Sequence, residues 1–165
     1  AFGFNDIDAA HIGTLSFWMR PFAALAAGYL GDKFSHAKIT GFCFLIMALG
    51  ALLIWSGVFT MGMTPLILIN IAALSLGIYG LRGLYYALFQ EAKLPYLITG
   101  SAIGLVSVIG YTPDIFFGPL MGFILDRYSG SLGHEYLFGL VAIFALAGYI
   151  TSILYRRTVK KSGNH

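Results

Sequence analysis

Charged side chains are scarce in this sequence. Asp, Glu, Lys and Arg make up only 10% of its 165 residues, whereas hydrophobic residues make up 58%. A soluble globular domain carries about 25% charged residues. So few charges cannot cover the surface of a soluble protein, and lipid must therefore cover much of this one. The scarcity argues against an ordinary soluble enzyme or binding domain and favours an integral membrane protein.

Cysteine is nearly absent as well. The single cysteine, Cys43, lies in an apolar run, so no disulfide can form within the chain and a cysteine-based metal site is disfavoured. We expect Cys43 to be a small residue that faces lipid or a neighbouring helix. The sequence has no His-Glu-x-x-His motif and no serine nucleophile elbow. We therefore expect no metal, no other cofactor and no enzymatic activity.

Long apolar segments are what the sequence has instead. A helix that crosses a bilayer needs about 20 mostly apolar residues. Five segments meet this requirement, at residues 9–30, 37–56, 64–88, 97–125 and 136–155. No segment alternates as the strands of a membrane barrel do. The sequence predicts one all-α transmembrane domain over residues 1–165 with a tail at 156–165, and Pro113 and Pro119 predict a bend in the fourth segment.

The basic residues between these segments predict an orientation. With the loop after the first segment placed inside, seven of the ten Lys and Arg residues fall inside: Lys33, Lys38, Lys93, Arg156, Arg157, Lys160 and Lys161. Only Arg127 falls outside, and Arg20 and Arg82 lie within segments. The positive-inside rule therefore predicts a cytoplasmic C-terminus, and we expect a bacterial inner membrane. Bases scattered between apolar segments, rather than gathered in a stripe, argue against a nucleic-acid partner.

Two stretches of the chain, 94 residues apart, read alike. Residues 28–35 and 122–129 both run Gly, aromatic, aliphatic, any residue, Asp, base, aromatic, Ser. Two unrelated helix-end signals could give the same pattern. However, the first copy ends inside and the second outside, as in the inverted repeats of secondary transporters. If each repeat unit has three helices, the chain is a six-helix half that lacks one helix.

The first copy carries a family resemblance. Gly28-Tyr29-Leu30-Gly31-Asp32-Lys33, followed by Lys38, resembles the loop signature of the major facilitator superfamily. That signature reads Gly, any residue, Leu, any residue, Asp and then basic residues, and it recurs between helices eight and nine. The resemblance implies that Gly28, Asp32, Lys33 and Lys38 form a conformational loop motif. Ser35-His36-Ala37 stands where the family has Gly-Arg-Arg, which weakens the expected latch.

A second resemblance lies in the fourth segment. Gly118, Pro119 and Gly122 resemble the Gly-Pro packing signature that the family carries in helix five and echoes in helix eleven. The five segments would then be helices eight to twelve of a carrier similar to the organic-anion and sugar-phosphate branches. The resemblance implies two partners besides the substrate: the N-terminal half of the same transporter and the lipid bilayer.

Three charged residues lie within the apolar segments. Each costs at least about 2.5–3.5 kcal/mol at mid-bilayer, so Arg20, Arg82 and Asp114 are expected to face a cavity or a partner. Arg20 and Asp114 are related by the 94-residue repeat, and each precedes its loop aspartate by 12 residues. That spacing is about 18 Å of helix, which reaches the middle of a bilayer core. Transporters bind substrates and coupling ions near this plane.

Roles follow from side-chain chemistry. A guanidinium pairs with carboxylate or phosphate, so Arg20 and Arg82 are candidate substrate-binding residues. Tyr79 and Tyr111 lie on the same helical stripes as Arg82 and Asp114 and join them as candidates. Asp114 is a candidate for proton coupling, with a structural ion pair as the alternative. Asn70 is expected to form a hydrogen bond between helices.

These features together predict a secondary active transporter. It would move a small organic anion, such as a sugar phosphate or a carboxylate, by alternating access coupled to an ion or a proton. Two alternatives stay open: a carrier of a neutral solute or a cation, as in drug efflux, and a membrane receptor or scaffold that does not transport.

Overall fold

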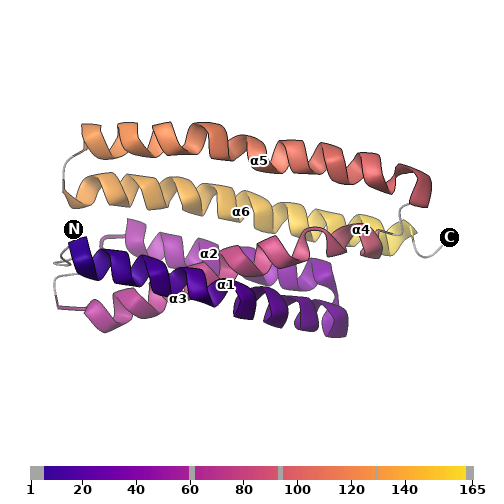
Figure 1. Ribbon diagram of the computed structural model, residues 1–165, viewed down its shortest axis with the longest axis horizontal. Coiled ribbons are helices and arrows are strands. Elements are labelled where there is room, and N and C mark those ends of the chain that lie inside the picture. The colour runs from indigo at the N-terminus through magenta and orange to yellow at the C-terminus, as the bar shows by residue number, and fades with distance from the viewer. Residues whose placement is uncertain (1–5, 60–61, 93–94, 129, 163–165) are drawn as a thin grey trace.

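The protein is all-α in the computed structural model, which describes residues 6–59, 62–92, 95–128 and 130–162. Its helices are α1 (Asp6–Phe34), α2 (His36–Trp55), α3 (Thr64–Leu84), α4 (Ala87–Glu91), α5 (Tyr96–Arg127) and α6 (Ser131–Ser162) (Figure 1). These ranges contain no strand. For a few residues within the helices, Asp114 and Lys160 among them, only the backbone is described. The predicted all-α fold class is confirmed.

Four of these helices are long and apolar enough to cross a bilayer. Within the described ranges they are His36–Trp55, Thr64–Leu84, Leu97–Arg127 and Ser131–Val159. The predicted span at 9–30 lies in α1 and is not among the four. The 29 residues of α1 nevertheless extend about 43 Å, which exceeds the thickness of a bilayer core. A fifth span at α1 stays a prediction.

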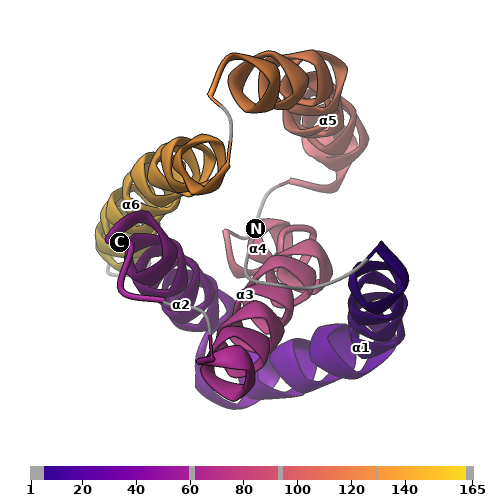
Figure 2. The same ribbon diagram turned by 90° about the vertical axis from the view of Figure 1, so that its left-hand side faces the viewer.

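The helices form an open arc. Helix α1 packs against α3, α3 against α2, α2 against α6, and α6 against α5, and Figure 2 shows this order around the arc. Helix α5 stands at one end and contacts mainly α6, for example where the Phe117 ring lies 5.5 Å from the Phe144 ring. None of the described side chains of α5 is buried. The outer face of α5 therefore has no cover within this part of the chain.

Small residues allow the central helices to approach closely. A Cβ at Gly41 of α2 would lie 2.6 Å from Ser152 Oγ of α6, so any larger residue there must displace that hydroxyl. Asn70 of α3 donates a hydrogen bond from Nδ2 to the Gly50 carbonyl of α2 at 3.0 Å, and this confirms the predicted bond between helices. Cys43 is buried among α1, α2 and α3, so it faces helices rather than lipid.

Helices α1 and α5 run in opposite directions. In Figure 1, α1 runs from left to right and α5 from right to left, which is the relation that an inverted repeat requires. The end of α1, the start of α2, short helix α4 and the end of α6 lie together at the right-hand end. We call this the α1–α2 turn end of the bundle. Lys33, Lys38, Arg156 and Arg157 all belong to segments at this end.

The ends of α3 and α6 differ from the predicted limits. Helix α3 ends at Leu84 and α4 starts at Ala87, where the sequence predicted one segment over 64–88. Helix α6 continues to Ser162, so the predicted tail begins inside a helix; no glycine or proline interrupts residues 149–162. Helix α5 stays helical through Pro113 and Pro119, so any bend there does not break it.

Candidate functional site

Arg20 of α1 lies over an aromatic ring of α3. Its guanidinium carbon is 5.1 Å from the centre of the Tyr79 ring and 5.2 Å from that of Phe17. Both distances are within the range of cation–π attraction. The structure thus brings together two of the predicted substrate-binding residues. Among the described side chains, no carboxylate pairs with Arg20.

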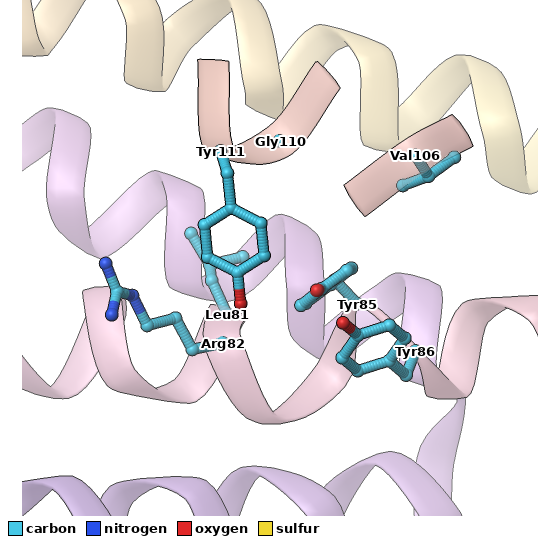
Figure 3. A pocket seen from close by; sticks show the side chains of 7 residues that line it. All are labelled: Leu81, Arg82, Tyr85, Tyr86, Val106, Gly110 and Tyr111. Carbon is cyan, nitrogen blue, oxygen red and sulfur yellow. The ribbon is translucent and has the colours of Figure 1, made fainter. Parts of the chain in front are cut away.

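A pocket of about 380 Å³ lies between α3 and α5. Its polar lining comes from Arg82 and from three tyrosines, Tyr85, Tyr86 and Tyr111; Leu81, Val106 and Gly110 complete it. Figure 3 shows Tyr111 reaching from α5 toward α3, with its hydroxyl directed at the side where Tyr85 and Tyr86 lie. The volume is within the range of small-molecule sites, about 300–1,000 Å³.

The tyrosines form a hydroxyl-rich wall. The rings of Tyr85 and Tyr86 lie 3.8 Å apart, and the Tyr86 hydroxyl is 3.4 Å from Ser107 Oγ of α5. Arg82 is exposed and makes no ion pair with any described carboxylate. The described lining of the pocket therefore offers one guanidinium and several hydroxyl donors, and none of its described residues is acidic.

Arg20 and Arg82 lie at adjoining positions and do not form one cluster. Tyr79, which contacts Arg20, precedes Arg82 by three residues on α3, so both lie on one face of that helix. Arg20 itself does not line the pocket. Asp114 follows Tyr111 by three residues in α5, but its side chain lies outside the described part, and its role stays a prediction.

The sequence allows Tyr85 and Tyr86 to line a cavity, with aromatic packing as the alternative, and the structure places both in this pocket. They sit where α3 ends and α4 begins, a break that the apolar sequence does not mark. The available signal was position: Tyr86 follows Arg82 by four residues, which places both on the pocket side.

The predicted loop motif is held by a residue that the sequence did not point to. Glu91 of α4 accepts hydrogen bonds from the Ala37 backbone N–H at 2.9 Å and from Ser35 Oγ at 2.6 Å. His36 bridges to Asp32, with Nε2 at 3.1 Å from Oδ1, and its Nδ1 lies 3.8 Å from Glu91 Oε2. A carboxylate at a helix N-terminus is favoured by the helix dipole. Ser35-His36-Ala37 is therefore the N-terminus of α2, and Glu91 caps it.

The remaining motif residues make few contacts in this chain. Lys33 lies 5.7 Å from the Phe34 ring, and Lys38 lines a different pocket at the α1–α2 turn end. A Cβ at Gly28, Gly118 or Gly122 would meet no atom within 4 Å. The packing role expected of Gly118, Pro119 and Gly122 stays a prediction that requires a neighbour beyond the described residues. In the part of the chain with described side chains, no group of three His, Cys, Asp or Glu could hold a metal ion.

Comparisons with known proteins find relatives among bacterial membrane proteins. The chain is 29% identical over 136 residues to "Inner membrane protein YihN" of Escherichia coli (strain K12), which covers 81% of this chain and 32% of that protein. It is 37% identical over 67 residues to "Inner membrane protein YqcE" of the same strain, covering 39% of this chain and 16% of that protein.

A third relative is named as a transporter. The chain is 30% identical over 164 residues to "Probable nitrate transporter NarT" of Staphylococcus haemolyticus (strain JCSC1435), which covers 97% of this chain and 40% of that protein. The chain thus spans less than half the length of the curated relatives it matches. No family model and no solved structure matches it. The similarities, together with the apolar helices, support a transporter-related integral protein of the bacterial inner membrane.

Proposed function

We propose that the chain is part of a secondary active transporter that moves a small organic anion by alternating access, coupled to a proton or another ion. The observation that carries this proposal is the α3–α5 pocket, where Arg82 and three tyrosines converge and no acidic residue is among the described lining. Arg20 of α1 adds a second guanidinium. It lies over the ring of Tyr79, which is about one helical turn from Arg82 on α3. Neither guanidinium is neutralised by a described carboxylate.

The chemistry of this lining favours an anionic group. A guanidinium forms charge-assisted, bidentate hydrogen bonds with carboxylate or phosphate oxygens, and phenol hydroxyls donate to the same oxygens. A cation would instead need carboxylates, and the described lining has none. The relative named a probable nitrate transporter is named for an anion, which also supports this class of substrate.

The open arc supports a partner on the side of α1 and α5. Large apolar side chains on both helices are exposed, among them Phe22 of α1 at 71% and Ile115 of α5 at 78%. Helix α3 packs against both α1 and α2. The 94-residue repeat relates α1 to α5 and α2 to α6, so α5 and α6 have an equivalent place for one more helix. We propose that this helix and the N-terminal half of the same transporter cover α1 and α5, with lipid around the outside. Alternating access would then be movement of one half against the other about the site.

Uptake by the full-length protein in proteoliposomes tests the proposal. A panel of organic anions, neutral solutes and cations is offered with and without a proton gradient, to the wild type, Arg82→Gln and Arg127→Gln. Arg127 is an exposed base at the far end of α5 and serves as the matched control. We expect gradient-dependent anion uptake that falls about tenfold or more in Arg82→Gln, since hydrogen bonds to charged groups contribute about 1.5–3 kcal/mol.

Three results would contradict the proposal. Equal losses in Arg82→Gln and Arg127→Gln would remove Arg82 from the site. Uptake of cations or neutral solutes in place of anions would overturn the substrate class. No uptake of any solute by a folded protein would favour a receptor or scaffold.

A further inference from the structure

A second pocket lies at the α1–α2 turn end of the bundle. It has a volume of about 680 Å³, and its polar lining comes from three segments: Ser35 and Lys38 at the start of α2, Glu91 at the end of α4, and Tyr149, Arg156 and Arg157 on α6. It shares no residue with the α3–α5 pocket. The proposed transport site therefore does not account for it.

The charges around this pocket are unbalanced. Its described lining has three bases, Lys38, Arg156 and Arg157, and one carboxylate, that of Glu91. Glu91 directs its two oxygens to the Ser35 hydroxyl and the Ala37 N–H, at 2.6 and 2.9 Å. None of the three bases has a carboxylate within 4.0 Å among the described side chains. The pocket thus presents a surplus of positive charge to any group that enters it.

The walls of the pocket are fixed by hydrogen bonds between helices. The Tyr155 hydroxyl of α6 donates to the Leu88 carbonyl of α4 at 2.6 Å, and Ser152 Oγ of α6 donates to the Ala37 carbonyl of α2 at 3.1 Å. These bonds hold α2, α4 and α6 together beneath the bases. The site is therefore a shaped recess between helices and not only a set of flexible side chains on a surface.

Position along α6 places the pocket at the membrane surface. Residues Tyr149, Ile153, Arg156 and Arg157 all line it, at steps of four, three and one, so they share one helical face. Along this face, the aromatic Tyr149 and the aliphatic Ile153 are followed by Arg156 and Arg157. Apolar residues below and bases above match the boundary between acyl chains and headgroups.

We infer that this pocket binds the phosphate group of an anionic phospholipid headgroup. Basic pockets between transmembrane helices bind anionic headgroups because the bases neutralise the phosphate while the acyl chains lie along the apolar helix surface. Arg156 and Arg157 supply guanidinium donors for phosphate oxygens, and Lys38 supplies a third charge from the opposite wall. Free inorganic phosphate offers the same chemistry without acyl chains, so the test separates the two sources.

Lipid binding to the purified full-length protein in a neutral detergent tests this inference. Native mass spectrometry is used to titrate the protein with phosphatidylglycerol, with phosphatidylcholine and with inorganic phosphate. We expect phosphatidylglycerol to bind more tightly than phosphatidylcholine, and neutralising a base to weaken that binding about fivefold, since each base near an anionic surface contributes about 1 kcal/mol. Lys38→Gln and Arg157→Gln are measured singly and together, and Arg157→Lys should retain most of the affinity.

Lys33→Gln is the matched control, because Lys33 is an exposed base at the same end that does not line the pocket. Equal loss in Lys33→Gln and Arg157→Gln would show diffuse attraction to the surface and overturn the inference. Saturable binding of inorganic phosphate that displaces phosphatidylglycerol would assign the pocket to a soluble phosphate instead. Thermal melting identifies variants that do not fold. If the double variant does not fold, the single variants decide, and unchanged phosphatidylglycerol binding in both of them also overturns the inference.

Discussion

Glu91 accepts a hydrogen bond from the backbone N–H of Ala37 at 2.9 Å, although 54 residues separate them in the sequence. The same carboxylate accepts from Ser35 Oγ, so one residue of α4 satisfies two donors at the start of α2. Helix N-termini leave backbone N–H groups without partners inside the helix, and a carboxylate there is favoured by the helix dipole. Glu91 thereby ties α4 to the turn that carries the predicted loop motif.

Replacing Glu91 should lower stability. We expect Glu91→Ala to reduce the free energy of unfolding by about 1–2 kcal/mol, the usual effect of losing a helix N-cap, and thermal melting in detergent measures it. Glu135→Ala is the control, because Glu135 is the sequence's other glutamate and makes no hydrogen bond among the described contacts. Equal melting temperatures for the two variants would show that the cap contributes nothing.

Replacement by alanine should affect stability differently at two glycines, because their surroundings differ. A Cβ at Gly50 would lie 2.8 Å from Asn70 Oδ1 and 3.0 Å from Leu74, whereas one at Gly104 would meet no atom within 4 Å. Gly50→Ala must displace Asn70, whose hydrogen bond to the Gly50 carbonyl joins α2 to α3. We expect a loss of about 1–3 kcal/mol for Gly50→Ala from overpacking, whereas Gly104→Ala creates no clash within the described part of the chain.

Melting temperatures of the purified full-length variants measure this difference. No loss in Gly50→Ala would contradict the close packing of α2 against α3. A loss at Gly104 as large as that at Gly50 would show that a neighbour beyond the described residues covers α5.

Tyr79 should act on transport through Arg20. Its ring lies 5.1 Å from the Arg20 guanidinium carbon, so Tyr79→Phe keeps the cation–π contact and Tyr79→Leu removes it. Cation–π contacts contribute about 0.5–2 kcal/mol, so we expect anion uptake to fall about two- to thirtyfold in Tyr79→Leu and to change little in Tyr79→Phe. Tyr29→Leu, at an exposed tyrosine of α1, is the control. A loss in Tyr79→Phe equal to that in Tyr79→Leu would assign the effect to the hydroxyl instead.

Apolar length was enough to predict the helices, but not the contacts between them. Each predicted segment corresponds closely to α1, α2, α3 with α4, α5 or α6, because runs of about 20 apolar residues have few other solutions in a bilayer. The spacing of Tyr79 and Arg82 on one helical face followed from the 3.6-residue period. The hydrogen-bond partner of Ser35 and Ala37 could not be predicted in this way, because nothing in the sequence near Glu91 shows that α4 folds back onto α2. The same holds for the basic pocket, whose Lys38 and Arg157 meet only through tertiary packing.

Asp114 should separate coupling from substrate binding. It lies in α5 three residues after Tyr111, which lines the α3–α5 pocket, and the 94-residue repeat makes it the counterpart of Arg20. If Asp114 carries the coupling proton, Asp114→Asn should abolish uptake driven by a proton gradient, because the amide cannot be protonated and released. Exchange of labelled for unlabelled substrate across the membrane needs no net proton movement, so it should persist in the same variant.

Two measurements on the same proteoliposomes distinguish this role from a structural ion pair. Asp126→Asn, at the other aspartate of α5, is the control and should retain gradient-driven uptake. A structural ion pair predicts a lower melting temperature and loss of both uptake and exchange in Asp114→Asn, since removing one partner leaves a charge uncompensated in the membrane. Loss of uptake alone, with exchange and melting temperature retained, assigns Asp114 to coupling.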